Sequence, residues 1–244
     1  TTTIRQLRQF RIVFPEGFTR AQMAARVQVV AKIAERESRH KVKLSGNAYA
    51  AATAKPRTFP GFGSKKLPFE GFLFPDTYDF DRKSTAAELV QNQLAEFTSK
   101  WSTLNLSYAQ SKNLTPYDVL TIASMVEGEA QVPSERPLVA AVIYNRLHDH
   151  MPLGIDATLR YGLHIPPTQS LTQSELQNPT PYNTRLHDGL PPTPINNPGM
   201  ASLQAAAHPA HVDYLYFVRK PDHRHHYFTS NYQDFLQHEA QYGY

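Results

Sequence analysis

One segment in the middle of the chain carries strong signals for the start and the end of a helix. Thr115 is a favoured N-cap residue, Pro116 follows at the first helical position, and Asp118 supplies a carboxylate in the first turn. An apolar body occupies residues 119–126, and Pro133 breaks the pattern. The segment therefore predicts a helix that begins at Thr115 and ends before Pro133.

The residues before this helix predict a small α/β module. Residues 10–14 alternate loosely between apolar and polar positions, as in a short strand. Thr19 and Gln22 form a capping box, and apolar residues at helical spacing follow it. Residues 55–66 are basic and rich in Gly and Pro, which predicts a loop, and residues 72–74 predict a strand leaving it.

The residues after a boundary near 81–85 predict mainly helices. A second capping box, Thr85 with Glu88, opens one helix, and apolar periodicity predicts another over residues 135–148. Residues 154–198 carry many prolines and predict a long loop, and loops of this length are commonly functional. The last predicted elements are a helix over 202–208, strands over 214–218 and 227–229, and a helix capped by Asn231. The whole pattern predicts an α+β fold.

Composition excludes several classes of protein. The 244 residues are 41% hydrophobic and 19% charged, which is ordinary globular usage, and the absence of cysteine excludes disulfides, zinc–thiolate sites and thiol catalysis. No apolar run approaches the roughly 18 residues of a membrane span, and residues 1–14 lack the apolar core of a signal peptide. We therefore expect any membrane anchor of the native protein to lie outside this sequence. The net charge of +4 suits an acidic polymer or an anionic membrane face without deciding between them.

The central helix carries the first candidate for chemistry. On a helical wheel Glu127 falls between Leu120 and Ala123, at the edge of the apolar stripe. Partial desolvation there raises the pKa of a carboxyl and favours the protonated form that a general acid needs. Glu129 lies on the other edge if the helix passes Gly128. A carboxylate that points to solvent near a helix end is the commoner alternative, and the wheel does not choose between the two glutamates.

Polar and aromatic residues gather in the Pro-rich stretch: Asp156, Thr158, Tyr161, Tyr182, Asn183 and Thr184. Hydroxyls and amides hydrogen-bond sugar hydroxyls, and aromatic faces stack on sugar rings, so the set predicts a sugar-binding groove. A Pro-stiffened surface loop is the commoner alternative. His223, His225 and His226 match known metal-ligand spacings poorly and predict a solvated turn, and the basic residues over 36–43 predict a solvated helix end.

Several segments occur in an order that is typical of one family. They begin with residues 69–78 (FEGFLFPDTY), 123–130 (ASMVEGEA) and 142–147 (VIYNRL). Later segments agree at 155–158, 181–184, 189–195, 197–199, 202–209 and 214–218. Together they resemble the endolytic murein transglycosylase family (MltG, YceG-like), from about Ile12 to the C-terminus.

The resemblance implies an α+β architecture of two parts. A small LysM-like α/β module would occupy residues 1–82, and a larger, lysozyme-like mixed catalytic domain would occupy residues 83–244. It also implies a peptidoglycan-cleaving enzyme of the bacterial cell envelope, extracytoplasmic and membrane-anchored in its full-length form. The implied partners are peptidoglycan glycan strands and peptidoglycan synthases, whose nascent strands the enzyme would terminate, and not nucleic acid.

The resemblance assigns residues as well. The family's catalytic Glu is the first acidic residue after the Ala-Ser-x-Val run, which is Glu127 here, and Gly128 departs from the Lys that members usually carry. The substrate-binding residues are expected to be Glu129, Asn145, Asp156, Tyr161, Tyr182, Asn183 and Thr184. One carboxyl that acts first as acid and then as base would need no metal and no cofactor.

Two rival functions remain open from the sequence. A hydrolysing muramidase would need a second carboxylate, for which Asp156 and Glu129 are the candidates. A cell-wall-binding scaffold would rely on the LysM-like module alone. Asn183 is expected to hydrogen-bond the substrate or to orient Glu127, with the capping of a turn as the structural alternative.

Overall fold

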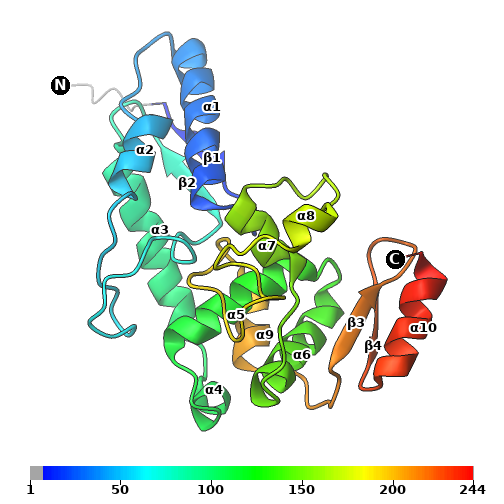
Figure 1. Ribbon diagram of the computed structural model, residues 1–244. Coiled ribbons are helices and arrows are strands. Elements are labelled where there is room, and N and C mark those ends of the chain that lie inside the picture. The colour runs from blue at the N-terminus through cyan, green and yellow to red at the C-terminus, as the bar shows by residue number, and fades with distance from the viewer. Residues whose placement is uncertain (1–7, 244) are drawn as a thin grey trace, which may run out of the picture. The chain divides into compact units, whose positions relative to one another are not determined.

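The computed structural model describes residues 8–243, and the chain divides into two compact units, one ending at Thr103 and the other beginning at Leu104 (Figure 1). Of residues 8–243, 46% are helical and 8% are in strands, so the expected mixed architecture is confirmed at that level. Among the described residues, each unit contains one two-stranded antiparallel sheet. None of the helices in residues 8–243 has the length and apolar character needed to cross a membrane.

The first unit pairs its two strands across more than sixty residues of chain. Strand β1 (Phe10–Val13) lies antiparallel to β2 (Thr77–Phe80), with Ile12 opposite Tyr78. Helix α1 (Arg20–Ser38) begins at the predicted capping box, helix α2 (Gly46–Ala52) follows, and helix α3 (Ala86–Trp101) begins at the second capping box. Local capping chemistry therefore set the starts of α1 and α3 as the sequence predicted.

Aromatic and apolar side chains fill the core of this unit. The Tyr49 hydroxyl is fully buried and donates to the side-chain oxygen of Gln93 at 2.6 Å, which ties α2 to α3. The rings of Phe59 and Phe72 stack at 3.7 Å. The prediction of a strand at residues 72–74 is wrong: these residues form a buried turn, and the strand begins at Thr77.

The compact first unit is longer than the expected N-terminal module. It continues past residue 82 and includes α3, because α3 packs on α2 and β2. The sequence placed residues 83–103 in the second domain. In the structure these residues pack as part of the first unit.

The second unit is built around helix α5 (Pro116–Glu129), which begins at the predicted Thr115 cap and passes Gly128. Every residue from Val119 to Val126 is buried. Helix α6 (Arg136–His148), preceded by the short 3-10 helix η1 (Pro133–Glu135), and helix α9 (Met200–Ala207) both pack against α5 (Figure 1). The smaller helices of this unit are α4 (Ser107–Ser111), α7 (Asp156–Leu163) and α8 (Gln173–Leu176).

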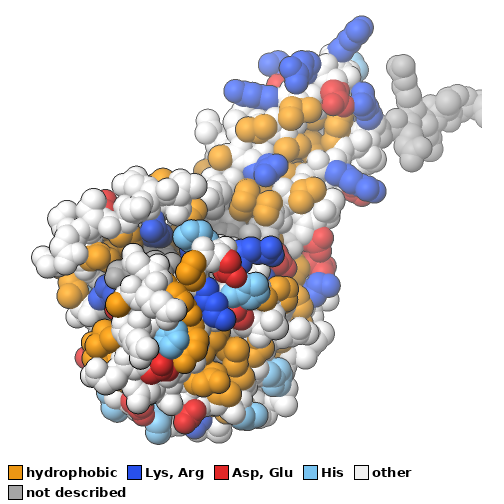
Figure 2. All heavy atoms as spheres, turned by 90° about the vertical axis from the view of Figure 1, so that its right-hand side faces the viewer, with side chains coloured by type: hydrophobic (Ala, Val, Ile, Leu, Met, Phe, Trp, Pro, Cys, Tyr) orange, Lys and Arg blue, Asp and Glu red, His pale blue; other side chains and the backbone are white. Residues whose placement is uncertain are grey.

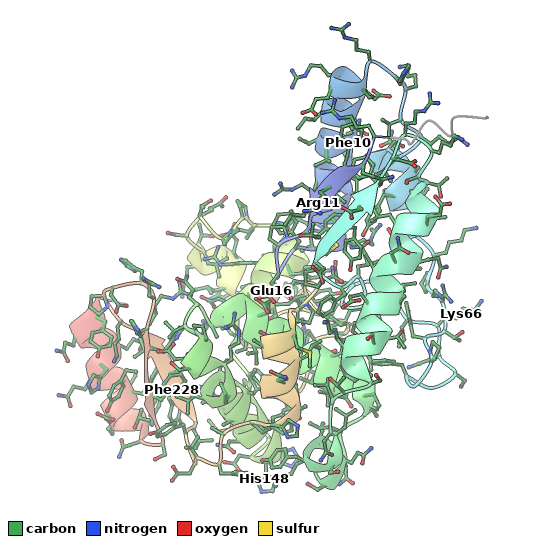
Figure 3. All side chains as sticks on the ribbon, turned by 180° about the vertical axis from the view of Figure 1, so that it is seen from behind. Phe10, Arg11, Glu16, Lys66, His148 and Phe228 are labelled. Atoms are coloured by element: carbon green, nitrogen blue, oxygen red, sulfur yellow. The ribbon has the colours of Figure 1, made fainter. Side chains whose placement is uncertain are left out.

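The stretch 154–198 is more ordered than its prolines predicted. Helix α7 occupies residues that we expected to be loop, and it packs against α5. The C-terminal part of the unit is a hairpin of β3 (Tyr216–Arg219) and β4 (His226–Thr229), covered by α10 (Tyr232–Tyr242). Figure 3 labels Phe228 in this hairpin, whose strand β3 also contacts α6.

Candidate active site

Glu127 lies in the last turn of α5, where two other helices begin near its carboxyl group. Its side chain is only 8% exposed. The backbone N–H of Gly199, the N-cap residue of α9, donates to Oε2 of Glu127 at 3.1 Å. The positive end of the α9 dipole therefore faces this carboxylate and stabilises negative charge on it.

Arg136, the first residue of α6, approaches the other oxygen of the same carboxyl. Its Nη2 atom lies 3.8 Å from Oε1 of Glu127, and its side chain is 12% exposed. Its Nε atom donates to the hydroxyl of Ser202 at 3.1 Å, and Ser202 is fully buried in α9. The planar guanidinium is thus fixed by α9 while it faces the end of α5, a geometry that a flexible lysine ammonium would not reproduce.

The loop before α9 is hydrogen-bonded to α5 at Ser124, about one helical turn before Glu127. The hydroxyl of Ser124 accepts the N–H of Ile195 at 3.0 Å, and the carbonyl of Ser124 accepts from the side-chain amide of Asn196 at 2.8 Å. The side-chain oxygen of Asn196 is buried without a hydrogen-bond partner. The two hydrogen bonds hold the loop before α9 against the turn of α5 that precedes Glu127.

Glu129 lies two residues after Glu127 on α5, in a different environment. It is 9% exposed, and its Oε1 accepts the N–H of Ala157 in the first turn of α7 at 3.3 Å. Burial, and secondarily the nearby Asp156 carboxylate, raise the pKa of Glu129 above its ordinary value. The N-cap residue of α7, Ile155, has no side-chain oxygen, so Glu129 serves as the cap of α7 from another helix.

Glycine at position 128 lets α7 approach this closely. A Cβ atom on Gly128 would lie 3.0 Å from Cβ of Ala157 and 3.6 Å from Cδ1 of Ile195. A side chain at this position would require the start of α7 to give way slightly at Ala157, whereas its contact with Ile195 would be an ordinary one. Glycine at position 128 therefore suits the close packing of α5 against the start of α7.

Three of the predicted substrate-binding residues remain partly accessible near α7. Asp156 is 44% exposed and its Oδ1 lies 2.6 Å from a guanidinium nitrogen of Arg185. The rings of Tyr161 and Tyr182 meet edge to face at 5.1 Å, and both side chains are partly exposed. The hydroxyl of Tyr182 also pairs with that of Thr193 at 2.9 Å.

The other predicted substrate-binding residues hold the fold instead, and this corrects the expectation that they contact substrate. Asn183 is fully buried, and its amide donates to the carbonyls of Leu176 and Asn178 at 2.9 and 2.8 Å. It therefore caps a turn, which was the structural alternative, and it has no donor left for a ligand.

Asn145 and Thr184 are engaged in the same way. The side-chain amide of Asn145 donates to the carbonyls of Val212 and Tyr214, both at 2.9 Å, which ties α6 to the segment before β3. Thr184 is 2% exposed, and its hydroxyl accepts the N–H of Ile155 at 3.0 Å. Thr184 and Glu129 are buried and position neighbouring elements, while Asn145 remains partly exposed although its side-chain amide is engaged.

The C-terminal hairpin is joined to the start of α6 by a buried pair. The Glu135 carboxylate accepts the backbone N–H of His226 at 3.0 Å, and its other oxygen lies 2.8 Å from Nδ1 of that ring. Burial lowers the pKa of His226 below its ordinary value, although the Glu135 carboxylate acts in the opposite direction. His226 thus belongs to the core, while within residues 8–243 no group of three or more His, Asp or Glu is arranged to hold a metal ion.

These features can be compared with known proteins. The model of the YceG-like family matches residues 1–241. The chain belongs to the YceG-like family. Two of its curated relatives are each named endolytic murein transglycosylase: one from Bacillus subtilis (strain 168), 38% identical over 64% of this chain, and one from Streptococcus pneumoniae (strain R6), 30% identical over 91% of it. The chain spans about 43% of the length of each of these relatives.

A solved YceG-like structure also matches the fold. The crystal structure of a yceG-like protein from Listeria monocytogenes has a TM-score of 0.72 and 28% sequence identity, and the match covers 93% of this chain and 75% of that one. The arrangement of α5, α6 and α9 therefore belongs to a YceG-like fold.

The sequence did not reveal Arg136, Ser202 and Gly199 as neighbours of Glu127. The only sequence signal lay in the positions of Arg136 beside a helix start and of Gly199 just before a predicted helix. Neither pattern predicts that Arg136 or Gly199 lies beside Glu127, because this depends on how α5, α6 and α9 pack.

Proposed function

We propose that this YceG-like chain carries the catalytic unit of an endolytic lytic transglycosylase that cleaves the MurNAc–GlcNAc β-1,4 bond of peptidoglycan. The observation that carries the proposal is the position of Glu127, whose carboxyl group meets the Gly199 N–H on one oxygen and Arg136 on the other. The names of the curated relatives, endolytic murein transglycosylase, support the substrate class.

In the proposed reaction, Glu127 acts twice. Its protonated carboxyl donates to the oxygen of the glycosidic bond, and the C1–O bond breaks through an oxocarbenium-like transition state. The carboxylate that results then takes the proton of the muramyl C6 hydroxyl, and the C6 oxygen bonds to C1 to form the 1,6-anhydro ring. No water enters the product, and Glu127 ends protonated as it began.

The surroundings of Glu127 support this use of a single carboxyl. Between the two steps the carboxylate is negatively charged, and the guanidinium of Arg136 with the N-terminus of α9 stabilises that charge. The 3.8 Å separation of Arg136 Nη2 from Oε1 is longer than a hydrogen bond, so the carboxyl group is not locked into a tight ion pair.

The hydrolytic rival needs a second carboxylate, and neither candidate is free to serve. Asp156 lies 2.6 Å from the guanidinium of Arg185, and Glu129 is buried as the cap of α7. A nucleophile or a base for water would have to leave these partners first. The environment of both groups therefore favours the transglycosylase reaction over hydrolysis.

We further propose the finer features that the resemblance implies for the full-length protein. The first unit corresponds to a LysM-like module and the second to a lysozyme-like catalytic domain. The protein acts in the extracytoplasmic cell envelope, is anchored in the plasma membrane by a segment outside this sequence, and terminates nascent glycan strands beside peptidoglycan synthases.

Product mass distinguishes the proposed reaction from its rivals. Purified peptidoglycan digested with the protein should give anhydromuropeptides, about 18 Da lighter than the corresponding hydrolysis products. Reducing muramic acid ends as the main product would establish a muramidase instead. Retention on peptidoglycan without any cleavage would establish a binding scaffold. A Glu127→Gln digest run in parallel identifies any contaminating activity.

A further inference from the structure

The charges of the chain are distributed unevenly between the two units. The residues up to Thr103 include 17 of the 25 Lys and Arg but only 9 of the 21 Asp and Glu, a formal net charge of +8. The residues from Leu104 on include 8 Lys and Arg against 12 Asp and Glu, a net charge of −4. The mild total of +4 therefore conceals a strongly basic first unit.

The outward face of α1 combines cations with exposed aliphatic side chains. Val29 is 56% exposed and Ile33 is 39% exposed, one helical turn apart. Lys32 and Arg36 lie on the same face and are exposed, and the opposite face carries the residues buried in the core of the unit. Figure 2 shows hydrophobic side chains lying among Lys and Arg side chains on this unit. Two neighbouring aliphatic side chains and two cations thus share one exposed helix face.

More cations follow where α1 ends. Arg39, Lys41 and Lys43 are exposed in the loop to α2. The backbone N–H of Lys43 donates to the carbonyl of Arg82 at 3.1 Å, which places the exposed Arg82 beside them. We call the seven residues Val29, Lys32, Ile33, Arg36, Arg39, Lys41 and Lys43 the basic face of α1.

Both carboxylates of α1 are already engaged. Glu37 pairs with Arg8 at 2.7 Å, and the Glu35 carboxylate accepts the N–H of Val42 at 3.1 Å. Within the described part of the chain, the five cations of the basic face form no ion pair. Their charge is therefore available to an external anion.

We propose that the basic face of α1 binds the surface of an anionic phospholipid bilayer. Lys and Arg side chains are attracted to anionic headgroups, while Val29 and Ile33 can enter the boundary between headgroups and acyl chains. A soluble acidic polymer would use the same cations but would gain nothing from two exposed aliphatic residues. The presence of both kinds of side chain on one helix face therefore favours the bilayer.

The test measures how the whole chain partitions onto lipid vesicles. The vesicles contain equal parts of phosphatidylglycerol and phosphatidylcholine, with pure phosphatidylcholine vesicles as the neutral comparison and soluble polyglutamate as the competing acidic polymer. Co-sedimentation at 0.1 M salt should show binding to the anionic vesicles that is at least about tenfold stronger than to the neutral ones, and weaker at 0.5 M salt.

Two variants separate the contributions of charge and apolar contact. Lys32→Glu with Arg36→Glu should lower partitioning at least about tenfold. Val29→Gln with Ile33→Gln keeps helix-forming residues but removes the apolar contact, and should lower partitioning about fivefold or more. Lys112→Glu with Arg224→Glu makes the same change in net charge at exposed positions of the second unit and should bind like the unchanged chain. Circular dichroism melting checks that each variant folds.

Three results would overturn the proposal. Equal binding to neutral and anionic vesicles would remove the role of charge. Full binding by Val29→Gln with Ile33→Gln, together with displacement by polyglutamate, would establish an acidic polymer as the ligand. Loss of binding in the second-unit control variant would show that net charge alone is responsible.

Discussion

The guanidinium of Arg136 lies 3.8 Å from the carboxyl group of Glu127, although the two residues belong to different helices. The hydroxyl of Ser202, on a third helix, accepts from Nε of the same guanidinium at 3.1 Å. Three helices thus meet here: α5 carries the carboxyl group, α6 places Arg136 beside it, and α9 holds the Arg136 guanidinium through Ser202.

Glu127→Gln should reduce peptidoglycan cleavage at least about a thousandfold, because one carboxyl group performs both proton transfers and an amide performs neither. The melting temperature should change little, since the amide oxygen still accepts the N–H of Gly199. Turnover of purified glycan strands, with the melting curve of the same sample, checks both expectations. Substantial activity in a well-folded variant would remove Glu127 from the catalytic role.

Arg136→Lys should lower kcat about tenfold or more while KM changes little. The lysine ammonium cannot hold Ser202 and face Glu127 with the fixed geometry of a guanidinium, so the charge that stabilises the carboxylate is misplaced. Kinetics on glycan strands across a range of pH measures the effect, and the pH profile of kcat should shift as well. Arg224→Lys, at an exposed position of the same unit, is the matched control. A rise in KM alone would make Arg136 a substrate-binding residue.

Local chemistry explains which helices the sequence predicted. Thr115 is the N-cap residue of helix α5. Its hydroxyl accepts the backbone N–H of Asp118, and the Asp118 carboxylate accepts the N–H of Thr115. Four consecutive residues therefore determine where this helix starts. Helix α7 lacks a local cap, because its capping oxygen comes from Glu129, 28 positions from Ala157. Residues that neighbour α7 in the sequence do not indicate such a distant cap, and its segment was therefore expected to be a loop.

In the candidate site, too, local sequence patterns indicated some residues, whereas others are recognised only from the packing of the helices. Glu127 was identified from its place at the edge of an apolar stripe and from the family motif. Arg136 was not, because its contact with Glu127 exists only once α6 has packed on α5. Asn183 was given the wrong role for a related reason: a Pro-bounded loop segment suggests an exposed site, whereas its amide is buried and caps a turn.

Asn183→Ala should destabilise the protein by about 3 kcal/mol and leave the activity of the folded fraction within about threefold of normal. The substitution leaves the buried carbonyls of Leu176 and Asn178 without their donor and removes the acceptor for the N–H of Arg185. Denaturant unfolding measures the loss, and cleavage assays at low temperature measure the activity. Gln177→Ala, at an exposed neighbouring position, should change neither. Loss of activity with unchanged stability would return Asn183 to the substrate site.

Glu129→Gln should stabilise the protein relative to the unchanged chain, and the difference should grow as the pH rises above about 4.5, the ordinary pKa of this side chain. Burial raises the pKa of Glu129 in the folded state, so the folded protein binds a proton that the unfolded chain releases. The stability contributed by the neutral carboxyl is therefore present at low pH and is lost as the pH rises through the folded pKa.

Glutamine reproduces the neutral form at every pH and still offers an oxygen to the N–H of Ala157. Thermal unfolding of both proteins at pH 5 and pH 8 measures the difference. Glu129→Ala is the matched control: it removes both the titrating carboxyl and the cap of α7, so it should be about 1 kcal/mol less stable than Glu129→Gln at both pH values. Parallel melting profiles of the Glu129→Gln variant and the unchanged chain would mean that Glu129 is ionised in the folded protein, and the cap of α7 would then be a charged one.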